Sequence, residues 1–254
     1  MKICIQRDGL TLRGEIVKPD NIKKCPIVIL MHGFKGNRGY DESSNLFLLA
    51  SLLKKSEIAS IRFDFNGHGE SDGLFENMTV HNELSDGKAI LDYVKTLDYV
   101  SDIFILGHSQ GGVIASMLSG YYHENFKGVI LTAPAATLVD DAIKGECQGV
   151  SYDPNNIPDY LEINNGKYKV GGMYFRIAQT LEIYKIASQY TGPVCLIHGD
   201  NDTVVDKISS TRYHECYKNS ELHIINGESH SLNGRYRENI LNIILEFIKK
   251  HCEK

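Results

Sequence analysis

SDIFILGHSQGGVIASML, residues 101–118, joins an apolar run to a second apolar run through a serine enclosed by glycines. The first run is typical of a buried strand, and the second has the spacing of a helix. Gly107-His108-Ser109-Gln110-Gly111 therefore stands at a strand-to-helix turn and matches G-x-S-x-G, the pattern of a nucleophile elbow. Such a turn either only avoids a steric clash or also presents the serine hydroxyl as a nucleophile, and residues elsewhere in the chain distinguish the two.

Strand-like and helix-like segments alternate on both sides of this turn. Strands are predicted as a hairpin over 2–7 and 10–18, and then over 26–34, 58–65, 102–108, 127–134, 193–199 and 221–227. Helices are predicted over 44–55, over 79–97, after Ser109, and over 236–250. Because such alternation forms a mostly parallel sheet covered by helices on both faces, the sequence predicts a single α/β domain over residues 1–254. The first hairpin adds antiparallel strands at one edge.

The segment between Pro134 and Pro193 breaks this alternation. At roughly 60 residues it is far longer than an ordinary connection in an α/β unit, and it has no obvious buried strand. Residues 151–175 are rich in Tyr, Asn, Gly and Pro. We expect an inserted cap over 135–190 that contains a short hairpin and a helix near 173–187. Open α/β sheets bind ligands beyond the carboxyl ends of their strands, so the cap is expected over that edge.

A serine nucleophile needs a base to take its proton and an acid to orient that base. In chains with a nucleophile elbow the order is Ser, then Asp or Glu, then His. The strand predicted over 193–199 is followed by Asp200, Asp202 and Asp206. Asp202 lies far enough into the loop to face inward, whereas Asp200 is expected to cap the turn and Asp206 the next helix.

His230 is the predicted base. Among the ten histidines it alone lies in a late loop, after the last predicted strand and at the same sheet edge as Ser109. His32 and His198 precede glycines at strand ends and are expected to shape loops through hydrogen bonds. His108 adjoins the serine, but the alternation of side chains along a strand turns it away.

The oxyanion of an acyl-transfer reaction needs donors that are already in place. In a nucleophile elbow one donor is the backbone N–H of the residue after the serine, which is Gln110 here. The second comes from the loop after the first buried strand, for which we choose the N–H of Phe34. Gly33 and Gly36 permit the turn that this role requires, although an ordinary loop would use glycine there as well.

Charge, termini and cysteines exclude several classes of protein. The formal net charge of −5 gives no basic face for nucleic acid. The first residues read as a strand around Asp8-Gly9 rather than as a signal peptide, and no apolar window reaches the ~18 residues of a membrane span. The six cysteines are scattered, so free thiols are expected rather than disulfides. These features predict a cytoplasmic protein with no nucleic-acid or membrane partner.

Five landmarks resemble the α/β-hydrolase superfamily over nearly the whole chain. They are HGF at 32–34, DFNGHGES at 64–71, GHSQGG at 107–112, HGDNDTVV at 198–205 and His230. The resemblance implies the α/β-hydrolase fold, an eight-stranded and mostly parallel sheet flanked by helices, with the cap inserted after the sixth strand. It implies a serine hydrolase without a metal or an organic cofactor.

The cap is similar to that of the bacterial cinnamoyl (feruloyl) esterases. The similarity lies in DDAIKGECQGVSYDPNNIPD (140–159) and GGMYFRIAQTLEIYKIA (171–187). In that family a cap aspartate, a glutamine and a tyrosine reach the ring hydroxyl of a hydroxycinnamoyl group. The resemblance places these roles on Asp141 or Asp140, on Gln148 and on Tyr174. Such partners matter because a buried phenol hydroxyl without one would cost about 1–3 kcal/mol.

The leading interpretation is a serine carboxylesterase that acts on a small aromatic ester. Ser109 would attack the carbonyl, His230 would transfer the proton and Asp202 would orient His230. A short-chain carboxylesterase, monoglyceride lipase, thioesterase, aminopeptidase or acyltransferase would use the same triad, because specificity lies in the cap. A noncatalytic ligand-binding module is the candidate from a different class. The natural ester, the leaving alcohol, the mobility of the cap and the oligomeric state, including a homodimer, stay open.

Overall fold

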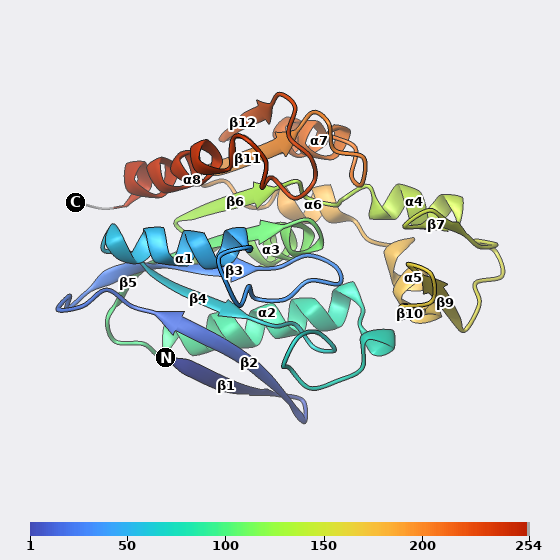
Figure 1. Cartoon of the computed structure of the whole chain (residues 1–254), viewed down its shortest axis with the longest axis horizontal. Helices are drawn as coiled ribbons and strands as arrows, with labels where there is room; N and C mark the ends of the chain where they lie inside the picture. The colour runs from blue at the N-terminus through green and yellow to red at the C-terminus, as the bar shows by residue number, and fades with distance from the viewer. Residues whose placement is uncertain (253–254) are drawn as a thin grey trace.

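The computed structural model describes residues 1–252, which are built on one eight-stranded sheet (Figure 1). The strand order is β1-β2-β4-β3-β5-β6-β11-β12. The strands are β1 Lys2–Arg7, β2 Leu10–Val17, β3 Cys25–Met31, β4 Ala59–Phe63, β5 Val100–His108, β6 Gly128–Thr132, β11 Val194–Gly199 and β12 Ser220–Ile225. The pairs β1–β2 and β2–β4 are antiparallel, and the other neighbours are parallel. The predicted mostly parallel sheet with an antiparallel hairpin at its edge is confirmed.

The sequence pattern of each strand reflects its place in the sheet. Every residue of β4, β6 and β11 is buried, as expected for inner strands that are covered on both faces. The edge strand β1 instead alternates, with Ile3 and Ile5 buried and Lys2, Cys4 and Gln6 exposed. One-sided burial of this kind suits an antiparallel strand at the rim.

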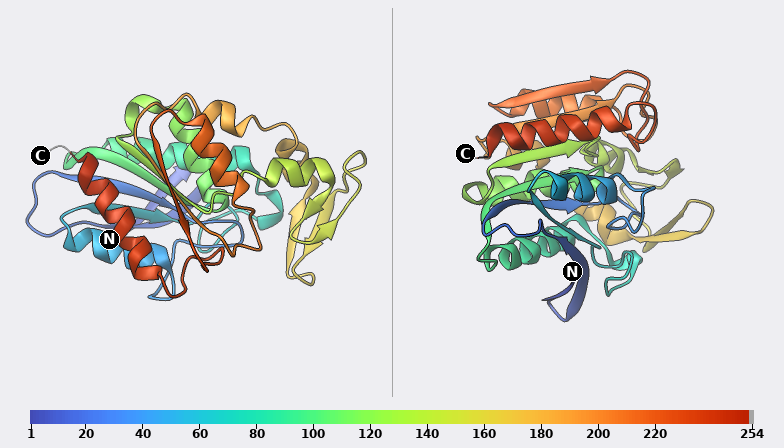
Figure 2. Two further views of the ribbon diagram at one scale, coloured as in Figure 1. Left: turned by 90° about the horizontal axis from the view of Figure 1, so that it is seen from above. Right: turned by 60° about the vertical axis from the view of Figure 1, so that its left-hand side comes forward.

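Helices cover both faces of the sheet (Figures 1 and 2). One face carries α1 Asn45–Lys55 and α8 Arg237–His251, and the other carries α2 Val80–Lys95, α3 Gln110–Tyr121, α6 Ile183–Ala187 and α7 Ile208–Cys216. In α8, the helix predicted over 236–250, an apolar stripe packs inward through Ile240, Ile244, Phe247 and Ile248. Within residues 1–252, no helix combines the length and apolarity that a membrane crossing requires.

The segment between β6 and β11 folds into small elements that lie beyond the ends toward which β6 and β11 point (Figure 1). They are α4 Leu138–Lys144, the hairpin of β7 Glu146–Cys147 with β8 Val150–Ser151, the hairpin of β9 Tyr160–Ile163 with β10 Tyr168–Gly171, and α5 Gly172–Ala178. We refer to residues 135–182 with these elements as the inserted segment.

The expected single helix near 173–187 and single hairpin are wrong, because the structure has two of each. The helix is interrupted between Ala178 and Ile183, since its two halves pack on different partners. α5 packs against α4, whereas α6 packs on α3, where a side chain at Gly120 would lie 2.1 Å from the carbonyl oxygen of Ile186. The chain must therefore turn between them.

Candidate active site

Ser109 occupies the turn between β5 and α3 in a backbone conformation that is rare for a residue with a side chain. Its φ and ψ are 55° and −122°, outside the regions that sterics allow freely. The flanking glycines are required by close contacts. A Cβ at Gly107 would lie 2.0 Å from the carbonyl oxygen of Gly111, and one at Gly111 would lie 2.4 Å from that of His32. The turn therefore combines tight packing with a strained serine, the geometry of a nucleophile elbow.

The structure brings together the three residues of the predicted triad. Ser109 Oγ lies 2.9 Å from Nε2 of His230, and Nδ1 of His230 lies 2.7 Å from Oδ2 of Asp202. They follow β5, β12 and β11, three parallel strands whose carboxyl ends share one edge of the sheet. The side chain of Asp202 is almost wholly buried, and that of His230 is 16% exposed.

Asp202 is held as an anion with both oxygens occupied. Oδ1 accepts the backbone N–H groups of Val204 and Val205 at 2.8 and 2.9 Å, and Oδ2 accepts from His230 and from Nε2 of His198. Burial alone would raise the pKa of this carboxyl, but the hydrogen bonds from His198, His230 and Val205 hold it well below its usual value. Because Oδ2 accepts, Nδ1 of His230 carries the proton and Nε2 offers its lone pair to the serine hydroxyl.

His198 is a partner of the triad that the sequence interpretation did not identify. Its fully buried ring places Nε2 3.1 Å from Asp202 and 3.0 Å from the carbonyl oxygen of Val205. Since both neighbours accept, Nε2 carries the proton and Nδ1 accepts from the Ser210 hydroxyl at 2.7 Å. The H-G-x-x-D spacing, with the histidine at the end of a buried strand, was the available signal.

The neighbouring groups behave as expected. Asp200 accepts the backbone N–H of Gly227, and Asp206 accepts that of Ile208 at the start of α7. His32 accepts the backbone N–H of Phe65, and burial lowers its pKa to about 3. These residues shape loops around the triad and do not compete for its roles.

His108 is also neutral. Burial, reinforced by the neighbouring His230, lowers its pKa to about 3. Its Nδ1 lies 3.2 Å from Oγ1 of Thr132, and its ring centroid is 5.0 Å from that of His230. It therefore lies beside the predicted base, with a partner of its own.

Phe34 and Gln110, the predicted oxyanion donors, line the same pocket as Ser109. Gln110 is the first residue of α3, a position whose N–H has no acceptor within the helix. The loop that carries Phe34 approaches the nucleophile closely, because a Cβ at Gly33 would lie 2.8 Å from Cβ of Ser109. This arrangement suits two N–H groups that converge on a developing oxyanion.

Replacing Gly33 with alanine is expected to lower kcat/KM for ester hydrolysis by about 100-fold, because a displacement of about 1 Å at the reacting centre has that effect. The added methyl group would have to move either the oxyanion loop or Ser109. Steady-state kinetics on the folded variant would measure the loss. Gly9→Ala, in the distant β1–β2 turn, is the control for a strained methyl group away from the site, because the φ of +81° disfavours alanine there although no neighbouring atom would lie within 4 Å; equal rates in the two variants would contradict the prediction.

The pocket next to Ser109 is formed by the inserted segment and by loops of the sheet. Phe34, Tyr174 and Phe175 supply aromatic rings, and Asp141 and Gln148 supply polar groups. Burial raises the pKa of Asp141. Asp140, the alternative to Asp141, does not line this pocket and instead pairs with Arg212.

Two of the predicted substrate-binding groups already have protein partners. Gln148 accepts a hydrogen bond from Nζ of Lys35 at 2.8 Å through its Oε1. The hydroxyl of Tyr174 donates to Oε1 of Gln110 at 2.7 Å, and Nε2 of Gln110 donates to Glu83 at 2.7 Å. The side chain of Gln110, to which the sequence interpretation gave no role, thus links the inserted segment to α2.

Glu83 could have been found from the sequence of α2. The buried face of this helix runs through Val80, Glu83, Gly87 and Ile90, so a carboxylate stands on the apolar stripe. A buried carboxyl needs a hydrogen-bond partner, and its presence in such a stripe indicates a polar group inside.

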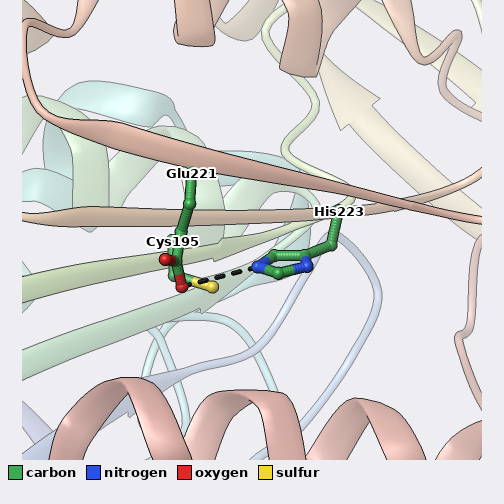
Figure 3. A group of neighbouring side chains, drawn as sticks. All are labelled: Cys195, Glu221 and His223. Carbon is green, nitrogen blue, oxygen red and sulfur yellow. Dashed lines mark ion pairs between the residues drawn. The ribbon is translucent and has the colours of Figure 1, made fainter. Parts of the chain in front are cut away.

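Within residues 1–252, three potential metal ligands lie together in one place, away from Ser109. Cys195 of β11 and Glu221 and His223 of β12 place one ligand atom each within 4.8 Å of one another (Figure 3). Glu221 lies 3.4 Å from His223 and 3.6 Å from Lys250. The group lies toward the amino-terminal ends of these strands, whereas the triad lies at their carboxyl ends. All six cysteines are free thiols, as expected.

Comparisons with known proteins show the family and the fold of the chain. The family model described as serine aminopeptidase S33 matches residues 23–150. The solved structure of Est1E from Butyrivibrio proteoclasticus with ferulic acid bound is 35% identical, with a TM-score of 0.93 and 98% of each chain covered.

The curated relatives that the chain matches include lipases. The monoglyceride lipase of Rattus norvegicus is 32% identical over 134 residues, which are 51% of this chain and 41% of the relative, so the chain spans less than half of that protein. A monoacylglycerol lipase of Mycolicibacterium smegmatis is 22% identical over 85% of this chain and 84% of its own length.

Proposed function

Because the chain belongs to the α/β-hydrolase family described as serine aminopeptidase S33, we propose that it is a serine carboxylesterase that hydrolyses hydroxycinnamate esters. The family together with the similarity to Est1E and to monoglyceride lipases supports an ester hydrolase, and the choice of acyl group is the further part of the proposal. The observation that carries the proposal is the hydrogen-bonded chain from Ser109 through His230 to Asp202, which opens on an aromatic-walled pocket. The ferulic acid bound in the similar Est1E structure supports an aromatic acyl group.

In the proposed reaction, Ser109 Oγ attacks the ester carbonyl while Nε2 of His230 takes its proton. Asp202 stabilises the imidazolium that forms, and the N–H groups of Phe34 and Gln110 donate to the oxyanion. His230 then gives the proton to the leaving alcohol, which departs and leaves an acyl-enzyme. Water attacks this intermediate by the same proton transfers and releases the acid.

The pocket would hold the acyl group. Phe34 and Tyr174 lie with their ring centroids 5.6 Å apart, so an aromatic acyl chain would meet aromatic faces on entering. In this role Asp141, Gln148 and Tyr174 would meet the polar substituents of the ring. The inserted segment, predicted as a cap over 135–190, would then determine specificity.

Monoglyceride hydrolysis is the second candidate, favoured by the similarity to the rat and M. smegmatis lipases. The comparison of kcat/KM for methyl ferulate, p-nitrophenyl butyrate and 1-monobutyrin distinguishes the candidates. We expect methyl ferulate to be preferred over both by at least about 10-fold, because only it pairs the polar groups of the pocket, and each tenfold factor corresponds to about 1.4 kcal/mol. A preference for either butyrate ester would reject the hydroxycinnamate proposal and retain the triad.

Two further alternatives can be recognised from the products. Acyl transfer would give a new ester, and a noncatalytic binding module would give no product. Adding an alcohol acceptor tests for acyl transfer, which would yield more transesterified ester than free acid. A noncatalytic binding module would leave Ser109 unlabelled by a fluorophosphonate probe. The cytoplasmic location stays a prediction.

A further inference from the structure

Three buried side chains form a continuous hydrogen-bonded chain behind the pocket. Glu83 of α2, Gln110 of α3 and Tyr174 of α5 are 1%, 2% and 7% exposed. Both links are 2.7 Å long. The catalytic proposal uses only the backbone of Gln110, so this side-chain network is unexplained by it.

The direction of the hydrogen bonds is set at Glu83. Nε2 of Gln110 lies 2.7 Å from Oε2 of Glu83 and 3.4 Å from Sδ of Met78, so this end of the amide faces two acceptors. An amide nitrogen with its two hydrogens satisfies both, whereas an amide oxygen would leave the thioether of Met78 without a donor and could bond Glu83 only if that carboxyl were protonated. Burial raises the pKa of Glu83 and the hydrogen bond from Gln110 opposes this rise, while the thioether of Met78 has no hydrogen to donate whatever the state of Glu83, so the amide nitrogen occupies this end. Oε1 of Gln110 is therefore the atom that faces Tyr174.

The hydroxyl of Tyr174 has one hydrogen, and it is used in the bond to Gln110. Burial raises the pKa of this phenol well above its usual value, so the hydroxyl keeps that hydrogen. Toward a ligand in the pocket, the tyrosine oxygen can then only accept. The carboxylate of Asp141 is a second acceptor in the wall, while Gln148 has its own oxygen occupied by Lys35.

We propose that Glu83, acting through Gln110, makes Tyr174 an acceptor toward the pocket, so that the enzyme selects acyl groups with a free ring hydroxyl over their methyl ethers. This inference rests on the proposed function and narrows its substrate class. Glu83 is a positioning residue, since it acts on the substrate only through two other side chains. A methyl ether has no hydrogen to donate and leaves the tyrosine oxygen and Asp141 without a partner.

The test compares methyl p-coumarate with methyl 4-methoxycinnamate, which differ by one methyl group on the ring oxygen. Wild-type enzyme is expected to prefer the free phenol in kcat/KM by about 10-fold or more. Glu83→Met replaces the carboxyl with a thioether, a much weaker acceptor, and is expected to reduce the preference to within about 3-fold, because the Gln110 amide is then held only weakly and can turn over. Glu83→Gln keeps an acceptor oxygen and is expected to restore most of the preference.

Gln110→Met is the second variant, in case Glu83→Met does not fold. It removes the middle link but keeps the backbone N–H, and it too is expected to lose the preference. The two esters differ by the same methyl group in every variant, so its bulk is constant. A change in their kcat/KM ratio between variants therefore reflects the hydrogen bonds from Glu83 through Gln110 to Tyr174. Asp86→Asn is the matched control, because Asp86 is a second buried carboxyl of α2 that bonds instead to Arg7 and Asn66.

Equal kcat/KM for the two esters in the wild-type enzyme would overturn the inference, as would an unchanged ratio in a folded Glu83→Met or Gln110→Met enzyme. A loss of the ratio in Asp86→Asn as large as in Glu83→Met would also overturn it. Failure of the wild-type enzyme to hydrolyse either aromatic ester, with p-nitrophenyl butyrate still turned over, would reject the proposed function itself and the inference with it.

Discussion

Ser109→Ala is expected to lower kcat for methyl ferulate by about 10⁴- to 10⁶-fold, because removal of a serine nucleophile leaves only binding and oxyanion stabilisation. His230 and Asp202 keep each other as partners in the variant, so the loss comes from the missing Oγ rather than from a rearranged site. Stopped assays with high enzyme concentration would measure the residual rate. Ser119→Ala, which removes a buried hydroxyl in the last turn of α3, is the control and is expected to keep its activity.

Substitutions at position 109 also measure how much the strained backbone of the elbow lowers the stability of the fold. Alanine at 109 keeps the positive φ and its strain, whereas glycine adopts such a conformation freely. Ser109→Gly is therefore expected to be more stable than Ser109→Ala by about 1 kcal/mol or more in denaturant unfolding. Full activity of Ser109→Ala would reject the nucleophile. Equal stabilities of the two variants would instead show that the turn is unstrained.

The sheet and the three triad positions could be predicted because their signals are local or topological. Runs such as residues 26–31 and 193–197 are apolar throughout, which only inner strands of a parallel sheet need. Once those strands are parallel, the residues after their carboxyl ends must share one edge. Ser109, Asp202 and His230 then converge, although more than ninety residues separate the first two along the chain.

Other features depend on contacts that no local pattern contains. The break between α5 and α6 arises because α6 docks against Gly120 of α3, a partner more than sixty residues away. Asp140 and Asp141 are adjacent on α4, and only the position of Arg212 shows which one turns from the pocket. Likewise, Tyr174 could be assigned to the pocket, but its bond to Gln110 follows from how α5 meets α3.

His198 illustrates a different limit. Its place at the end of β11 was clear from the sequence, and hydrogen bonding to a loop was the expected role. His198 does bond to the following loop, but one of its partners there is the carboxylate of Asp202, because the chain folds back within four residues. The imidazole of His198 therefore helps to hold the Asp202 carboxylate in the orientation in which it accepts from His230.

Asp202→Asn is expected to lower kcat by about 10⁴-fold with little change in fold, the second-largest loss among these variants. The pKa of Asp202 is held well below its usual value, so the wild-type enzyme has the carboxylate throughout the neutral pH range. Asparagine has almost the same shape but no charge and only one acceptor. Steady-state kinetics with a circular dichroism spectrum would measure the loss, and Asp200→Asn, a loop aspartate whose side chain accepts from the backbone N–H of Gly227, is the control.

The size of the loss follows from the partners that the asparagine must satisfy. The N–H groups of Val204 and Val205 need an oxygen at the Oδ1 position, so the amide nitrogen takes the place of Oδ2. In that position the amide nitrogen faces the imidazole N–H groups of His198 and His230, so hydrogen-bond donors oppose one another with no acceptor between them. His230 relieves this conflict by moving its proton to Nε2, which then points an N–H at the serine oxygen and cannot act as a base. The reverse amide orientation loses both backbone hydrogen bonds, so a variant with near wild-type kcat would show that His230 keeps its tautomer without this carboxylate.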